Sequence, residues 1–68
     1  MIDTKRQLTI KEWRKILNLS QADVADKLNI HLNTYREYEA HQDRIRIGTL
    51  IKFCNALGIK ISEVKIFD

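Results

Sequence analysis

The stretch LSQADVADKLNIHLNTYREYE, residues 19–39, decides the fold of this chain. It contains two short amphipathic segments that meet at Asn29 with no room for a loop between them. Ser20 is a favourable N-cap residue, and Asp23 three positions later completes a pattern that resembles a capping box. We therefore expect one helix that begins at Ser20 and a second helix over residues 31–39.

Five positions in this stretch meet the steric needs of two helices that cross steeply through a short turn. Ala25 is small at the point where the second helix would pass over the first. Asn29 tolerates the left-handed conformation that such a turn requires, and Ile30 can fill the space inside it. Tyr35 and Tyr38, three positions apart, give the second helix a buried side. The sequence thus predicts a tight elbow between two helices.

Helical spacing of apolar residues continues on both sides of this elbow. The segment TIKEWRKIL, residues 9–17, predicts a helix that Thr9 or an earlier residue caps and that stops near Asn18. Its expected inward stripe consists of Ile10, Trp13, Ile16 and Leu17.

The C-terminal third of the chain predicts two more helices. AHQDRIRIG, residues 40–48, is expected to be a polar loop, and TLIKFCNALG, residues 49–58, a fourth helix that Gly58 ends. Its expected inward residues are Leu50, Ile51, Phe53, Cys54 and Leu57. KISEV, residues 60–64, predicts a short fifth helix with Ile61 and Val64 inward. These segments together predict a compact all-α bundle of five helices.

Length and composition fit one domain that spans residues 1–68. The 12 Lys and Arg residues against 9 acidic ones give a net charge of +3, which permits nucleic-acid binding without requiring it. The single cysteine, Cys54, excludes an internal disulfide and fits a reducing compartment. The apolar runs are too short to cross a bilayer, and the N-terminal segment has no signal-peptide core. We expect a cytoplasmic protein without a membrane partner.

The sequence offers little for catalysis or metal binding. His31 and His41 sit on either side of the second helix of the elbow, and no further His or pair of Cys completes a ligand set. Cys54 is expected to be a small buried residue, and the Ser, His and Asp residues show no catalytic spacing. We expect neither an enzyme nor a bound metal or cofactor.

The second helix of the elbow is expected to present a polar face outward. If Tyr35 and Tyr38 define its buried side, then Asn33, Arg36, Glu37 and Ala40 point away from the bundle. A face of hydrogen-bonding groups and short side chains can enter a DNA major groove about 12 Å wide.

Three pieces of the chain now support a resemblance to a known family. LSQADVADKL, the pair YE at the end of the second helix and ALGIKISEV together resemble the phage repressor and Cro family of helix-turn-helix regulators, also called XRE-type. The resemblance covers about residues 8–64, which leaves an N-terminal arm, residues 1–7, and a short tail, residues 65–68. It implies a lambda-repressor-like fold and a sequence-specific transcriptional regulator, such as a repressor, that binds double-stranded DNA.

The resemblance also implies roles for matching positions. Gln21 resembles the residue that grips a phosphate and braces the recognition helix, and Arg14 with Glu39 resembles an ion pair between the first and third helices. The matching base-facing positions are Leu32, Asn33, Arg36 and Glu37, and those that contact phosphate or brace the helix are His31 and Thr34.

Several of these assignments have open alternatives. Arg44 and Arg46 either clamp phosphates or lie in a solvated loop, and Lys5 and Arg6 either touch DNA or form a mobile end. Leu32 is either a thymine contact or a residue at the rim of the core, and Asn33 either reads adenine or is an ordinary surface residue.

Three departures from the family pattern are also visible. The family usually has Gly where this chain has Asn29, and often Asn-Gly where it has Ala40 and His41, so the third helix can run on or end irregularly. The acidic Glu37 would accept a hydrogen bond from cytosine but repel phosphate.

One recognition helix covers only a few base pairs, so we expect a homodimer, formed in solution or only on DNA, and a palindromic operator. The expected dimer surface is the fifth helix with the tail that contains Ile66 and Phe67. The alternative function is an antitoxin or anti-regulator that mainly binds a protein partner.

Overall fold

The computed structural model describes residues 7–65, so Lys5, Arg6, Ile66 and Phe67, all named above, lie outside the described residues. The described chain is all-helical, with four α-helices and two single turns of 3-10 helix. The elements in order are α1 (Ile10–Ile16), α2 (Gln21–Leu28), α3 (Leu32–Ala40), η1 (Gln42–Arg44), α4 (Ile47–Leu57) and η2 (Ile61–Glu63).

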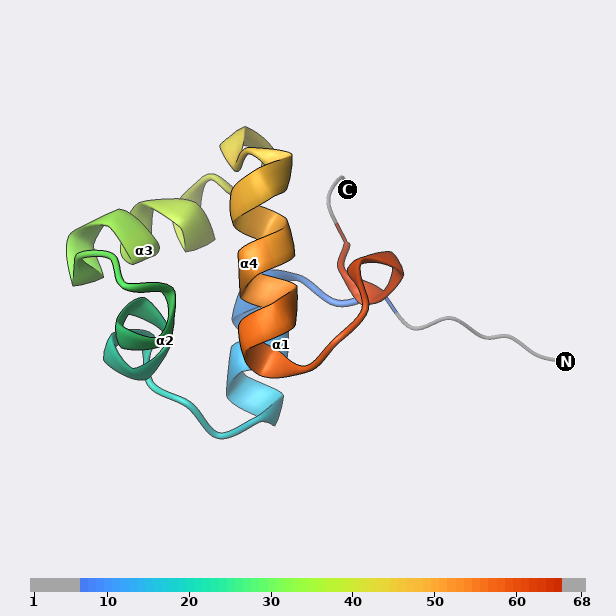
Figure 1. Cartoon of the computed structure of the whole chain (residues 1–68), viewed down its shortest axis with the longest axis horizontal. Helices are drawn as coiled ribbons and strands as arrows, with labels where there is room; N and C mark the ends of the chain where they lie inside the picture. The colour runs from blue at the N-terminus through green and yellow to red at the C-terminus, as the bar shows by residue number, and fades with distance from the viewer. Residues whose placement is uncertain (1–6, 66–68) are drawn as a thin grey trace, which may run out of the picture.

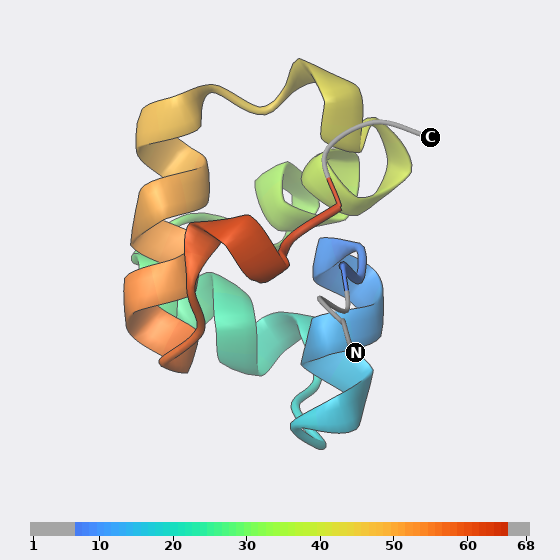
Figure 2. The ribbon, with the colours of Figure 1, turned by 90° about the vertical axis from the view of Figure 1, so that its right-hand side faces the viewer.

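The elements are arranged so that α3 lies at one edge of the molecule. In Figure 1, α2 and α3 form the elbow on the left, α4 stands beside them with α1 behind it, and η2 lies on the right. Figure 2 shows η2 between α4 and α1, on the side of the bundle away from the elbow. The N-terminal half of α3 is therefore remote from η2 and from the described part of the C-terminal tail (Figure 1).

The predicted starts of the first two helices are confirmed by two capping boxes. The Thr9 hydroxyl accepts a hydrogen bond from the Glu12 amide at the start of α1, and the Glu12 carboxylate accepts one from the Thr9 amide. Ser20 and Asp23 form the same reciprocal pair at the start of α2, with distances of 2.8 and 3.0 Å. Each box satisfies amides that the first turn of a helix leaves without partners.

Three helices end through residues in the left-handed conformation. Asn18, Asn29 and Gly58 have φ angles of 60, 57 and 72°. The amide of the residue after each one donates to a carbonyl in the last turn, as from Ile30 to Ala25 at 3.0 Å. This Schellman-type ending turns the chain sharply, and at Asn29 it makes the elbow predicted from the sequence.

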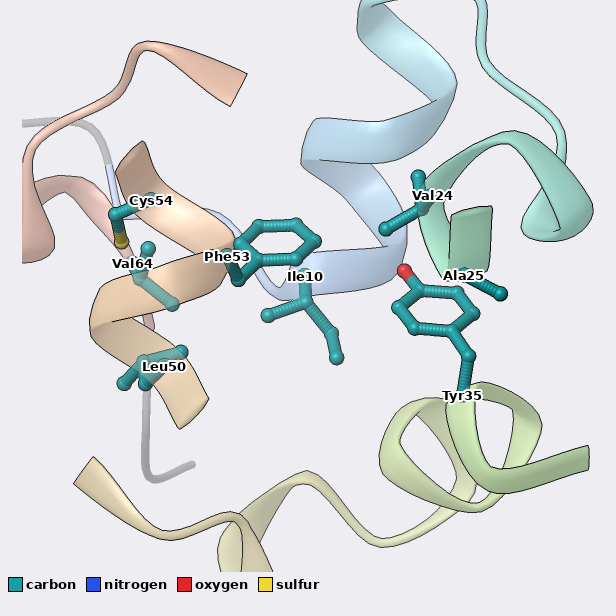
Figure 3. Close-up of a cluster of buried hydrophobic side chains, with 8 residues drawn as sticks. All are labelled: Ile10, Val24, Ala25, Tyr35, Leu50, Phe53, Cys54 and Val64. Carbon is teal, nitrogen blue, oxygen red and sulfur yellow. The ribbon is translucent and has the colours of Figure 1, made fainter. Parts of the chain in front are cut away.

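The core lies where α1, α2, α3 and α4 meet. Ile10, Val24 and Tyr35 are at most 1 % exposed, and Figure 3 shows Ile10 beside Phe53, with Tyr35 reaching up from α3 toward Val24. Ala25, Leu50, Cys54 and Val64 complete the buried set, with Trp13, Ile30, Tyr38 and Leu57 packed against it. Ala25 and Tyr35 are thus buried and Tyr38 is half-buried, as the predicted elbow requires.

The expectation of a fifth helix is wrong. Residues 60–64 form only η2, a single 3-10 turn, and the following residues are held differently. Leu8 and Val64 make a parallel bridge, in which the Lys65 amide donates to Leu8 O at 2.8 Å and the Leu8 amide donates to Glu63 O at 3.1 Å. Backbone pairing to the segment before α1 has replaced helical hydrogen bonds here, so the bundle has four α-helices.

Four residues expected to face inward are instead exposed. Ile16 is 60 % exposed, because it points away from the buried direction of α1, which passes through Ile10 and Arg14, four positions apart. Leu17 is 40 % exposed because α1 ends at Ile16 and Leu17 is its C-cap residue. Ile51 is 45 % exposed, since it lies to one side of the buried line through Leu50 and Cys54. Ile61, on the one turn of η2, is 38 % exposed.

The loop expected over residues 40–48 is more ordered than predicted. It contains η1, and α4 begins at Ile47 rather than at Thr49. The Gln42 side chain accepts a hydrogen bond from the Ile10 amide at 2.7 Å and donates one to Lys65 O. Gln42 therefore fixes η1 against the start of α1 and the C-terminal segment.

Candidate nucleic-acid interface

The outer face of α3 is the first component of the candidate site. Asn33, Arg36, Glu37 and Ala40 are all exposed, while Tyr35 on the opposite side is fully buried. The helical spacing predicted this division, because residues three and four apart share a face. The second helix of the elbow thus presents one amide, one guanidinium and one carboxylate to solvent.

A buried ion pair anchors α3 behind this face. Arg14 Nε lies 2.6 Å from Glu39 Oε2, and the two side chains are only 10 % and 5 % exposed. Arg14 Nη2 also donates to Glu39 Oε1, and Nη1 donates to Leu19 O at 2.9 Å. The structure thus brings together the two residues for which the sequence predicts a pair, and this pair joins α1 to the end of α3.

The environment of Glu39 favours its ionised form. Burial acts to raise the pKa of the carboxyl, but hydrogen bonds from Arg14 and Gln21 and the nearby Tyr35 hydroxyl outweigh it, so the pKa is lowered. The hydrogen bond to Glu39 raises the pKa of Arg14. Both groups therefore carry full charge near neutral pH, which keeps the anchor intact where the protein would act.

The Tyr35 hydroxyl lies beside this pair but outside hydrogen-bonding geometry. It is buried and has no hydrogen-bond partner among residues 7–65. Burial and the Glu39 carboxylate both raise its pKa, so the phenol stays neutral. A buried hydroxyl without a hydrogen-bond partner is unfavourable, so this group costs the fold some stability.

Gln21 links the anchor to the outer face of α3. It is the first residue of α2 and is half-buried, and its Nε2 donates to Glu39 Oε1 at 2.9 Å. Its Oε1 accepts from Arg36 Nε at 3.4 Å. The structure thus places Gln21, Arg36 and Glu39 in contact. The contact with Arg36 was not foreseen, because the sequence spacing does not show which way an amide turns.

The other predicted contact residues lie around α3. His31 is the exposed N-cap residue of α3 and makes no side-chain cap hydrogen bond, and Leu32 and Thr34 in the first turn are half-buried. His41, one turn after Glu37, lies beside the Glu37 carboxylate, with 3.8 Å between His41 Nε2 and Glu37 Oε1. Protonated His41 would offset the charge that makes Glu37 unfavourable near phosphate.

Arg44 and Arg46, the two arginines predicted as possible phosphate contacts, lie between α3 and α4. Arg44 ends η1, Arg46 is the N-cap residue of α4, and both side chains are exposed. Sequence reasoning missed Gln42, the residue that holds η1 in place. Its only signal was a neutral amide in a charged loop, and its partners, Ile10 and Lys65, are 32 and 23 positions away.

Neither a metal centre nor a membrane span is found in the described part of the chain. Within residues 7–65, no three His, Cys, Asp or Glu side chains are grouped in a way that could hold a metal ion. None of the described helices has both the length and the apolar character to cross a bilayer.

Comparison with known proteins identifies the class. A helix-turn-helix family model matches residues 10–64, which is most of the chain. The chain is also 37 % identical, over 51 residues, to the cryptic phage CTXphi transcriptional repressor RstR of Vibrio cholerae serotype O1. That alignment covers 75 % of this chain and 46 % of the relative, so the chain spans about half the length of the curated protein it matches. No solved structure gives a significant match.

The chain belongs to the helix-turn-helix family, with α2 and α3 as the two helices of the motif. The resemblance to phage repressors that was drawn from residues 19–39 and 56–64 is thereby confirmed.

Proposed function

We propose that this protein is a sequence-specific regulator of transcription that inserts α3 into the major groove of double-stranded DNA. One observation carries the proposal: a polar outer face is fixed on α3 by Tyr35 and the Arg14–Glu39 pair behind it. A rigid helix of this width fits a groove about 12 Å wide, and its N-terminal half is the part that reaches base edges in such docking.

Each predicted contact residue has a role in this docking. Asn33 can pair bidentately with adenine, Arg36 with guanine, and Leu32 at the start of α3 can contact a thymine methyl group. Glu37 would accept from a cytosine amino group. Phosphates would be held by Gln21 at the N-terminus of α2 and by the flanking side chains of His31, Thr34, Arg44 and Arg46.

The active species would be a homodimer. A single α3 spans too few base pairs for useful specificity, whereas two copies on half-sites about one helical turn apart would read a palindrome. We propose that the dimer assembles in solution or on the operator, and that the protein acts in the cytoplasm of its host. Binding would weaken steeply with salt, because each neutralised phosphate releases counterions.

Selection from random duplexes tests this function. The wild-type protein should enrich a palindrome in repeated rounds of electrophoretic shift, and Asn33→Ala should reduce affinity for it by about tenfold or more. Asn55→Ala is the matched control, because Asn55 is an exposed asparagine on α4 rather than on α3. Failure to enrich any duplex, or equal losses in the two variants, would count against the proposal.

The alternative, an antitoxin or anti-regulator, is not favoured, since the family match and the related repressor both fit regulation of transcription. It would regain support if the protein selected no duplex and co-purified tightly with another protein.

A further inference from the structure

A continuous chain of polar contacts runs from the interior to the outer face of α3. Arg14 on α1 donates to Glu39, Gln21 on α2 donates to Glu39 at 2.9 Å, and Arg36 on α3 donates to Gln21 at 3.4 Å. The first members are buried and the last is exposed. This series of hydrogen bonds therefore connects the buried Arg14–Glu39 pair, which stabilises the fold, to Arg36, a side chain proposed to read DNA.

The chemistry of the members fixes the direction of every hydrogen bond. An ionised carboxylate only accepts, so Gln21 must turn its NH₂ group toward Glu39. Its carbonyl oxygen then has to face the other way, toward α3. A carbonyl there demands a donor, and the guanidinium of Arg36 is a group that only donates.

The atom that Arg36 uses in this contact matters for recognition. Gln21 engages Nε, so the two terminal nitrogens of the guanidinium are left to form paired hydrogen bonds. Two such bonds to O6 and N7 of guanine are the commonest specific contact in the major groove. A long arginine side chain otherwise loses considerable rotamer freedom when it binds, and a contact made in the free protein reduces that loss.

We propose that Gln21 and Glu39 are positioning residues for Arg36, with Glu39 setting the orientation of the Gln21 amide and the amide holding Arg36 ready to pair with a base. This inference rests on the proposed function. Gln21 thereby acts on base preference through Arg36, in addition to any phosphate that it contacts.

The free protein provides the first test, which requires no DNA. NMR measures how fast the Nε–H proton of each arginine exchanges with water. The rate at Arg36 should be lower than at Arg44 and Arg46 by about threefold or more, which is the protection that a modest hydrogen bond gives. Gln21→Met, of similar volume but without either hydrogen-bonding group, should abolish the difference. Thr9→Ala removes the α1 cap far from Arg36 and should leave it unchanged. Equal exchange at all three arginines in the wild type would overturn the inference.

The second test uses duplexes selected by the wild type, with each base pair substituted in turn. Arg36→Ala should identify the base pair whose preference depends on Arg36, and Gln21→Met should reduce preference at that same pair by about fivefold. Glu39→Gln should do likewise, but Gln21→Met is the decisive variant because it leaves the ion pair intact. If Gln21→Met lowers affinity equally for all sequences, Gln21 only contacts phosphate and the inference is wrong.

The proposed function and the positioning role of Gln21 are distinguished by different outcomes. If no duplex is selected although Arg36 Nε–H is protected through Gln21, the proposed function is wrong and the positioning of a DNA-reading arginine is wrong with it. If a palindrome is selected but Arg36 Nε–H is unprotected, only the positioning role is overturned.

Discussion

Replacing Arg14 should cost this protein a large share of its stability. A chain of 68 residues is expected to be stable by roughly 3–10 kcal/mol. Arg14 makes two hydrogen bonds to Glu39 and one to Leu19 O, and its side chain is 10 % exposed. Its removal leaves the Glu39 carboxylate, 5 % exposed, with Gln21 as its remaining side-chain hydrogen-bond donor among residues 7–65.

Breaking one side of a buried ion pair costs about 3–5 kcal/mol, and the bond from Gln21 places this case near the lower end. We expect Arg14→Ala to lower the free energy of unfolding by about 3 kcal/mol, which in a domain of this size lowers the melting temperature by roughly 12–24 °C. Arg14→Met retains most of the aliphatic stem and should lose nearly as much if charge rather than packing is responsible.

Chemical denaturation followed by circular dichroism measures these differences. The double variant Arg14→Met with Glu39→Met should recover much of the loss, because it leaves no unpaired charge inside the protein. A loss of unfolding free energy below about 1.5 kcal/mol for Arg14→Ala would refute this reasoning. So would a double variant whose loss exceeds the sum of the losses of the two single variants.

Four further predictions follow from particular side chains. The pKa of Glu39 in the folded protein lies below its ordinary value of 4.5. The stability that ionised Glu39 contributes should therefore be present above pH 4.5 and be lost as the pH falls through the pKa of the folded state. Glu39→Gln should flatten the pH dependence of the melting temperature in this range. Tyr35→Phe removes a buried hydroxyl without a partner and should leave the free energy of unfolding unchanged or raise it by about 1 kcal/mol, so a loss of that size in denaturation would indicate a hydrogen bond. At Asn29, φ 57°, Gly should be tolerated while Val should cost about 1–2 kcal/mol, and equal melting temperatures would exclude strain at the elbow. Glu37→Gln should raise affinity for nonspecific duplex at low salt by about fivefold, measured by anisotropy, whereas no change would show that Glu37 lies away from phosphate.

The parts of the fold that were predicted correctly are those with local signals. Ser20 and Asp23 begin α2 through contacts within one turn, and Asn29 and Gly58 end helices through their own backbone preferences. The buried side of α3 followed from Tyr35 and Tyr38, three positions apart. Such features depend on neighbours in the sequence, so the sequence contains the information that predicts them.

The wrong predictions concern features that depend on contacts between residues far apart in the sequence. The expected fifth helix gave way to pairing between Val64 and Leu8, a contact across 56 positions that helical spacing does not report. Ile16 and Ile51 are apolar but point away from the buried direction of their helices, which the crossing of the helices sets. Gln42 was overlooked for the same reason, because its partners belong to the two ends of the described chain.

The central claim is that the outer face of α3 enters the major groove, and mapping amide chemical shifts by NMR during titration with the selected duplex tests it most directly. We predict that the largest changes fall on residues 31–37 and on the start of α2 at Gln21, with smaller ones at Arg44 and Arg46. Changes concentrated on α4 and η2, with residues 31–37 unaffected, would contradict the account.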